Sequence, residues 1–199
     1  DGVDDFVNAG MNATLDIPTD ATIELWTRIN AFTSSKYLIS DFDSLGSKSQ
    51  GSLRYTNGSS GNHFDFYQSH TDASFKLIEG TTMLQTNTWY HVAFVRDDLT
   101  KTVTLFVNGI PDSSSTYTGK TVENFSAVGN RIIGNTVSPF LDHINGDITK
   151  VKIYMNALSA TEINQNYLAD VNNFLNNCSS SSSSSGSTSS TSSSSGSTS

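Results

Sequence analysis

The chain has 199 residues and a formal net charge of −8, with 11 lysines and arginines against 19 aspartates and glutamates. This excess of acidic groups disfavours binding to nucleic acid or to an anionic membrane surface, and no apolar run is long enough to cross a bilayer. The length allows one domain with a full hydrophobic core.

Short runs in which apolar and polar residues alternate recur along the chain, and this period of two predicts β-strands. The predicted strands cover residues 6–8, 22–29, 36–42, 52–55, 63–68, 75–78, 89–96, 102–108, 131–133 and 148–154. The polar segment 111–124 is expected to cross between strands without forming one. Many short strands joined by turns favour an all-β fold, a two-sheet antiparallel jelly-roll sandwich.

The segment 88–110 is the clearest predicted hairpin. Asp97–Lys101 is rich in turn-forming residues, and Asn108-Gly109 is a strong turn dipeptide. Apolar residues occupy both faces of the two strands. A sheet with two apolar faces is expected to be covered on both sides, as in a layered sandwich.

A short C-terminal helix is predicted after residue 158. Ser159 and Glu162 have the spacing of a capping box, which satisfies free N–H groups at a helix start. The apolar residues that follow share one helical face: Ile163, Tyr167, Leu168, Val171, Phe174 and Leu175. We expect this face to pack on the sandwich, with Phe174 and Leu175 reaching a neighbouring subunit.

Four segments resemble the laminin-G-like branch of the concanavalin A-like lectin/glucanase superfamily. They are the DGVDD motif at 1–5, ATIELWTRIN at 21–30, the hairpin sequence at 89–110 and GDITKVKIYMNALSATE at 146–162. The resemblance covers roughly residues 1–168 and implies a concanavalin A-like sandwich. We expect this domain at 1–177 and a low-complexity Ser/Thr/Gly tail at 178–199. The fold alone does not decide function, because lectins, glucanases, adhesion modules and structural domains share it.

Catalysis is not expected. Glucanases of this fold carry a motif that resembles E-x-D-x-x-E, whereas the four glutamates here, at 24, 79, 123 and 162, are far apart. Asp41 and Asp43 could supply the two carboxylates that a glycosidase needs, but strand-end aspartates are more often turn formers. The four histidines lack zinc-ligand spacing. We therefore predict a non-enzyme.

Calcium is the cofactor that the resemblance implies, because laminin-G-like domains often bind one ion at the rim of the sandwich. Asp4 and Asp5 match the acidic pair of the DGVDD motif, and Asp142 and Asp147 flank a turn that could lie nearby. The alternative is that all four are solvated turn residues.

A sugar-binding surface would need exposed aromatic rings. Tyr37, Tyr55 and Tyr67 lie on predicted strands that could form one curved sheet, and we expect their rings to be exposed. Phe64 and Phe66 are expected in the core.

Attached sugars are also predicted. Asn-x-Ser/Thr sequons begin at Asn12, Asn57, Asn124 and Asn177. The tail after 178 consists of Ser, Thr and Gly, so it cannot form a core and is a candidate for dense O-glycosylation. Representative tail sites are Ser180, Ser187, Thr188, Thr191 and Thr198. These features predict a secreted, extracellular glycoprotein.

Three functional hypotheses remain open. The first is a structural subunit of a glycosylated fibril or surface assembly, in which copies associate through an open sheet edge and Cys178 forms an intermolecular disulfide. The alternative for Cys178 is an inert thiol. The second hypothesis is a carbohydrate-binding module tethered by a Ser-rich linker to a glycoside hydrolase. The third is a degenerate glucanase.

Overall fold

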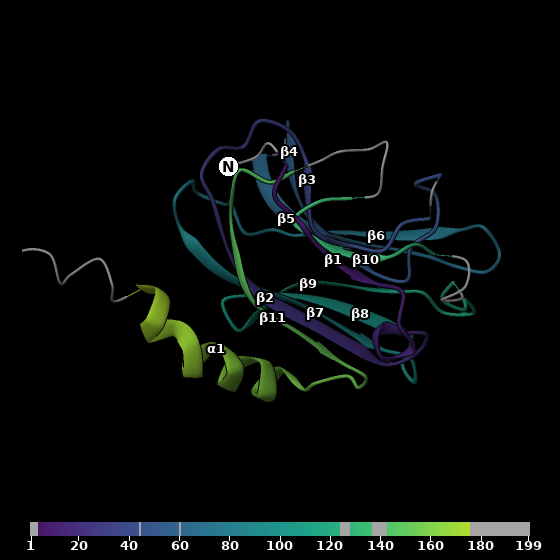
Figure 1. Ribbon diagram of the computed structural model, residues 1–199. Coiled ribbons are helices and arrows are strands. Elements are labelled where there is room, and N and C mark those ends of the chain that lie inside the picture. Colours follow the sequence, from purple (N-terminus) through teal and green to yellow (C-terminus); the bar gives the residue numbers. More distant parts are fainter. Residues whose placement is uncertain (1–3, 44, 60, 124–127, 137–142, 176–199) are drawn as a thin grey trace, which may run out of the picture.

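A computed structural model of the chain describes residues 4–43, 45–59, 61–123, 128–136 and 143–175. Two antiparallel β-sheets lie face to face, and one helix packs on the outer side of one sheet (Figure 1). The predicted all-β jelly-roll sandwich with a C-terminal helix is confirmed.

The two sheets contain six and five strands. In spatial order the six-stranded sheet is β1 (Val7–Gly10), β10 (Arg131–Ile133), β3 (Lys36–Ser40), β4 (Ser52–Gly58), β5 (Gly61–Ser69) and β6 (Phe75–Glu79). The five-stranded sheet is β11 (Gly146–Tyr154), β2 (Ala21–Ile29), β7 (Trp89–Asp97), β8 (Thr102–Val107) and β9 (Ile110–Thr116). The helices within the described residues are the 3-10 helix η1 (Ala13–Leu15) and the α-helix α1 (Ala160–Leu175).

Alternating side chains from both sheets form a core between them. Ile23, Leu25 and Ile29 of β2 are at most 1% exposed. The ring of Phe66 in β5 meets that of Phe94 in β7 at a centroid distance of 4.1 Å. Full burial of one such side chain contributes roughly 1.5–3 kcal/mol. Because neighbours in a strand point to opposite sides, this core also fixes which residues face outward.

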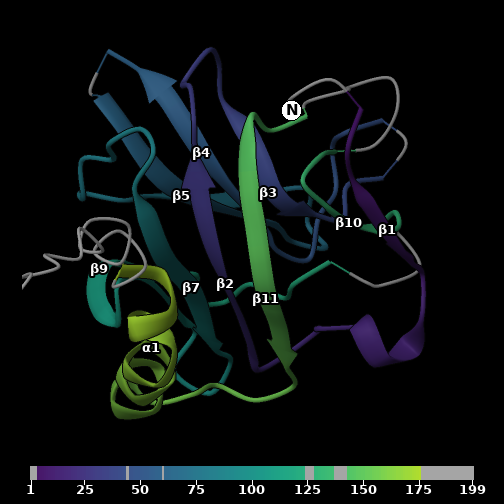
Figure 2. The same cartoon turned by 60° about the vertical axis from the view of Figure 1, so that its left-hand side comes forward.

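Helix α1 covers part of the outer face of the five-stranded sheet, beside β7 and β9 (Figure 2). Trp26 points outward from β2 yet is buried, because Phe174 and Tyr167 stack on its indole ring at centroid distances of 4.3 and 5.7 Å. Phe174 therefore packs within its own subunit, and its contact with a neighbouring subunit stays a prediction. Leu168, expected on the packing face, is 56% exposed.

The predicted capping box begins this helix. Ser159 N donates to Glu162 Oε2 over 2.7 Å, and Glu162 N donates to Ser159 Oγ over 3.3 Å. Both bonds satisfy backbone donors that a helix start leaves unpaired.

The polar segment 111–124 contains a strand that the sequence analysis missed. Strand β9 pairs along β8, with Thr104 opposite Ser114 and Val103 opposite Ser115. β9 is last in its sheet, so its side chains remain partly in solvent and need not alternate between apolar and polar. Because its residues are mostly polar serines, this strand shows no alternation of apolar and polar residues that would predict it.

A buried carboxylate, Glu24, lies beneath α1 on the outer side of β2. Its Oε1 accepts from Lys152 Nζ at 2.9 Å, its Oε2 accepts from Asn166 Nδ2 at 3.1 Å, and His91 Nε2 lies 3.5 Å away. Burial alone would raise the pKa of Glu24, but the hydrogen bonds from His91, Lys152 and Asn166 outweigh it and lower the pKa from 4.5 to about 2.

This lowered pKa predicts a loss of stability in acid. Because the pKa is lower in the folded than in the unfolded chain, Glu24 stabilises the fold above its unfolded value of 4.5, and this contribution disappears as the pH falls toward 2. The loss should be about 3 kcal/mol. Urea unfolding of the wild type and of Glu24→Gln across this range should show a shallower pH dependence in the variant. Parallel curves would contradict the assignment.

Candidate functional site

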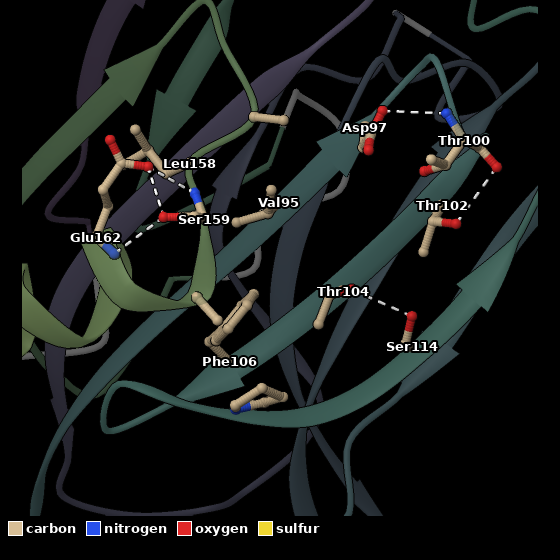
Figure 3. Close-up of a pocket in the computed structure, with 13 residues that line it drawn as sticks. Val95, Asp97, Thr100, Thr102, Thr104, Phe106, Ser114, Leu158, Ser159 and Glu162 are labelled. Atoms are coloured by element: carbon tan, nitrogen blue, oxygen red, sulfur yellow. Dashed lines mark hydrogen bonds between the residues drawn. The ribbon is translucent and has the colours of Figure 1, made fainter.

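A pocket lies on the outer face of the five-stranded sheet, beside the start of α1 (Figure 3). Its volume is about 780 Å³. Val95 and Phe106 contribute apolar wall, and the hydroxyls of Thr104 and Ser114 lie 3.1 Å apart at its side. Phe106 is 3% exposed, so the pocket offers no open aromatic surface. None of the predicted site residues lines it.

The outer face of the six-stranded sheet carries a continuous line of aromatic rings. Tyr37 of β3, Phe42 just after β3, Tyr67 of β5 and Phe75 of β6 form this aromatic row. Successive ring centroids, from Tyr37 through Phe42 and Tyr67 to Phe75, lie 5.1, 5.3 and 5.4 Å apart. Phe75 is 61% exposed and Phe42 only 4%, so the row is buried at Phe42 and open to solvent at Phe75.

Strand alternation explains why these rings face outward. Phe66 points into the core, so its neighbour Tyr67 points to the other side of β5. In β6, Ile78 is the core residue opposite Phe66, which places Leu77 and Phe75 on the outer side.

A line of charged residues runs beside the aromatic row. Tyr37, Arg54 and Asp65 are cross-strand neighbours on β3, β4 and β5. Arg54 donates to Asp65 Oδ2 from Nε at 3.2 Å, and its NH2 nitrogen lies 3.1 Å from the same oxygen. His63 Nε2 lies 3.2 Å from Asp65 Oδ1, and the Arg54 guanidinium stands 5.9 Å from the centre of the Tyr37 ring.

A small pocket of about 160 Å³ lies at the open end of the row. Tyr67 and Phe75 line it together with serine hydroxyls and the ion pair between Lys48 Nζ and Glu123 Oε2, which measures 3.3 Å. Ser69 Oγ belongs to the same wall and donates to the carbonyl of Ser47 over 3.2 Å. Aromatic and polar groups therefore converge at one place.

This combination suits a polyhydroxylated ligand with flat apolar faces. Aromatic rings provide contact area for such faces, while charged side chains form strong hydrogen bonds with hydroxyl groups.

Two of the three predicted sugar-binding tyrosines, Tyr37 and Tyr67, lie in the aromatic row. The prediction for Tyr55 is wrong: its ring is 0% exposed and packs edge-on against Phe32 at 5.3 Å. Tyr55 follows the inward alternation of β4, with Leu53 on the same side. Phe42, Phe75 and the Arg54–Asp65 pair were not among the predicted site residues. Alternation around Ile78 would have found Phe75.

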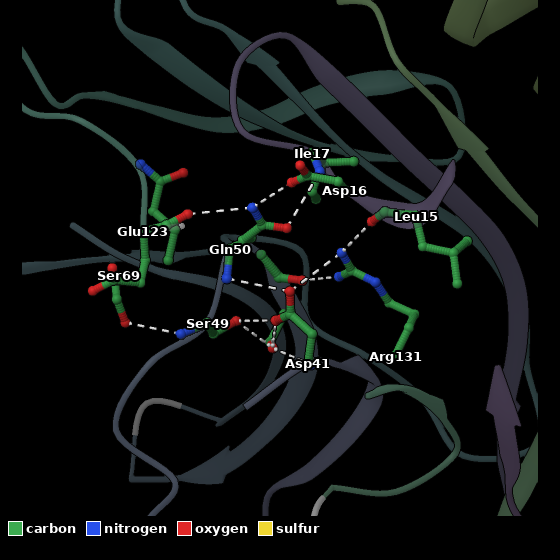
Figure 4. A network of polar contacts seen from close by, with 12 residues as sticks. Leu15, Asp16, Ile17, Asp41, Ser49, Gln50, Ser69, Glu123 and Arg131 are labelled. Carbon is green, nitrogen blue, oxygen red and sulfur yellow. Dashed lines mark hydrogen bonds and ion pairs between the residues drawn. The ribbon is translucent and has the colours of Figure 1, made fainter. Parts of the chain in front are cut away.

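The two aspartates considered for catalysis have separate structural roles. Asp41 is 1% exposed and lies in a polar network with Arg131 at 3.2 Å and Ser49 Oγ at 2.5 Å (Figure 4). Asp43 accepts from the backbone N–H groups of Ser47 and Lys48 at 2.7 and 3.1 Å, as a turn former does. The Asp41 carboxylate is thus buried and bound by neighbouring side chains, so a substrate cannot reach it.

The expected calcium ligands are not assembled in the part of the chain that the structure describes. Asp147 is held by Arg28 at 2.8 Å, and Asp4 and Asp5 are exposed. Asp142 lies outside the described residues. Within those residues, no group of three acidic, histidine or cysteine side chains could hold a metal ion. Calcium binding stays a prediction.

Two of the predicted N-glycosylation sites can be placed. Asn12 and Asn57 are exposed, and Asn12 Oδ1 accepts from Thr14 N at 3.0 Å before η1. Asn124, Asn177, Cys178 and the predicted O-glycosylation sites of the tail lie outside the described residues. Modification of all these sites stays a prediction.

Two antiparallel sheets packed face to face, with the aromatic row on the outer side of one of them, form a concanavalin A-like β-sandwich. The chain belongs to the concanavalin A-like lectin/glucanases superfamily, whose sequence model matches residues 1–164. The predicted resemblance is therefore confirmed. A search of curated proteins found no match. In the described residues, no helix is both long and apolar enough to span a bilayer.

Solved structures share this fold at low sequence identity. The CBM40 of the Ruminococcus gnavus IT-sialidase, bound to α2,3-sialyllactose, is 17% identical with a TM-score of 0.66, over 84% of this chain and 96% of that one. A heptameric SAP-like pentraxin from Limulus polyphemus is 16% identical with a TM-score of 0.58, over 80% and 79%. A putative carbohydrate-binding protein from Bacteroides ovatus is 17% identical with a TM-score of 0.64, over 80% of this chain and 44% of that one.

Proposed function

We propose that this chain is a non-catalytic carbohydrate-binding module whose ligand lies on the aromatic row. The observation that carries the proposal is the line of rings from Tyr37 to Phe75 beside the Arg54–Asp65 pair. Two structurally similar proteins, the CBM40 and the Bacteroides ovatus protein, are described as carbohydrate binders, which supports the same class of ligand here.

Binding without cleavage is the form of this proposal that the residues favour. Glycoside hydrolysis needs two carboxylates that flank the scissile bond. Next to the aromatic row, Asp65 is held by Arg54 and Glu123 by Lys48. Both acids are engaged as ion-pair partners, which leaves them less suited to act as a nucleophile or a general acid.

An extracellular location is part of the same proposal, because Asn12 and Asn57 are exposed sequons. Assembly into a glycosylated fibril or surface coat stays a prediction. The features that suggested it, Cys178 and the Ser/Thr tail, lie outside the described residues.

Removal of one ring should weaken glycan binding. Phe75→Ala and Tyr67→Ala each delete exposed contact area of the aromatic row. We expect each to reduce affinity about tenfold or more, because burial of an aromatic ring contributes roughly 1.5–3 kcal/mol. A glycan array would identify ligands of the wild type, and isothermal titration calorimetry would compare the variants.

Met155→Ala is the matched control, because Met155 is 51% exposed and follows β11 of the other sheet. Its affinity should equal that of the wild type. Unchanged binding in both aromatic variants, or no binding to any glycan, would contradict the proposed function.

A further inference from the structure

Three cations near the aromatic row have acidic partners. Arg54 lies 3.1 Å from Asp65, and Lys48 lies 3.3 Å from Glu123. Beyond the small pocket, Lys120 lies 2.5 Å from Asp72. The positive charge beside each end of the row is therefore already neutralised within the protein.

Because side chains alternate along β6, its glutamate faces outward beside the aromatic row and its lysine does not. Glu79 is exposed and is the cross-strand neighbour of Asp65, so both belong to the outer face. Lys76 alternates with Phe75 and Leu77 and therefore belongs to the opposite side of the strand. The whole chain is also acidic, with a net charge of −8.

We infer that the aromatic row selects uncharged glycans and rejects sialylated, uronic or sulfated ones. This inference rests on the proposed function and adds the class of ligand. An anionic sugar would lose hydration on binding, would meet Arg54 and Lys48 already paired with acids, and would be repelled by Glu79. The ligand named for the similar CBM40 structure, α2,3-sialyllactose, is anionic, so this chain should differ from that relative.

The test is a glycan array of matched pairs, in which each neutral oligosaccharide stands beside its sialylated or sulfated form. Lactose and α2,3-sialyllactose form one such pair. The array is probed at mildly alkaline pH, where histidine side chains ordinarily carry no charge. Under this condition we expect the bound glycans to be uncharged. The affinity for their acidic counterparts should be lower by a factor of about ten or more.

A charge-reversal variant tests the cause. Glu79→Lys adds an unmatched cation at an exposed position, so the fold should be retained. This variant should gain affinity for the acidic member of each pair, and the gain should shrink as salt is added. Glu79→Gln, the matched control, removes repulsion without adding a cation and should gain less.

The outcomes separate the two proposals. If acidic glycans bind as tightly as neutral ones and Phe75→Ala weakens both, the proposed function stands and the selectivity inference is overturned. Binding that Phe75→Ala and Tyr67→Ala leave unchanged would overturn the proposed site, and with it the inference. A Glu79→Lys variant that shows no gain for acidic glycans would also overturn the electrostatic explanation.

Discussion

Replacing Trp26 by alanine should lower the free energy of unfolding by about 3–5 kcal/mol, the usual cost of deleting a buried large aromatic ring. The indole is 1% exposed and is covered by Phe174 and Tyr167. Its loss would leave a cavity between α1 and β2 and would also expose the side of Glu24. Urea unfolding followed by far-ultraviolet circular dichroism would measure the change.

Phe75→Ala is the control, because 61% of that side chain is already exposed. Its free energy of unfolding should stay within about 0.5–1 kcal/mol of the wild type. If both variants lost the same free energy of unfolding, the burial of Trp26 under α1 would not stabilise the fold. This control also verifies that the glycan-binding variant is folded.

Replacing Arg96 by methionine should lower the free energy of unfolding by about 3 kcal/mol or more. The guanidinium is 0% exposed and donates to the carbonyl oxygens of Thr19 and Gln50, each at 2.6 Å, and to that of Ile17. Methionine would leave the buried Gln50 and Ile17 carbonyls unsatisfied, at about 1–3 kcal/mol each. Burial lowers the pKa of Arg96 to about 10, so the side chain remains charged at neutral pH.

The matched control is Arg28→Met, because the Arg28 side chain is 40% exposed and its partner Asp147 is 47% exposed. Exposed ion pairs contribute about 1 kcal/mol or less. The two variants should therefore differ clearly in the midpoint of urea unfolding. Similar midpoints would mean that the Arg96 donors can be replaced by water.

The sequence predicted the layered fold because its strongest signals are local. Ser159 and Glu162 specify the start of α1 through bonds only three residues apart. The hairpin of β7 and β8 follows from its turn residues, and its two apolar faces correctly indicated cover on both sides. Each of these features depends on residues that are close in the chain.

The candidate site depends on register between distant strands, which one sequence does not specify. Tyr55 and Tyr67 look alike in sequence, but the pairing of β4 with β5 places Tyr55 inward and Tyr67 outward. Phe42 joins the aromatic row from a loop position. For the same reason, the burial of Glu24 beneath a helix that begins 136 positions later could not be read from its neighbours.

Helix α1 and the aromatic row lie on opposite outer faces of the sandwich. The helix-covered face and the aromatic row are therefore on different sides of the domain. If copies were held side by side through their α1 faces, their aromatic rows would point in a common direction. A polymer with repeated binding epitopes could then engage several copies at once, and the combined avidity would exceed the affinity of any single row.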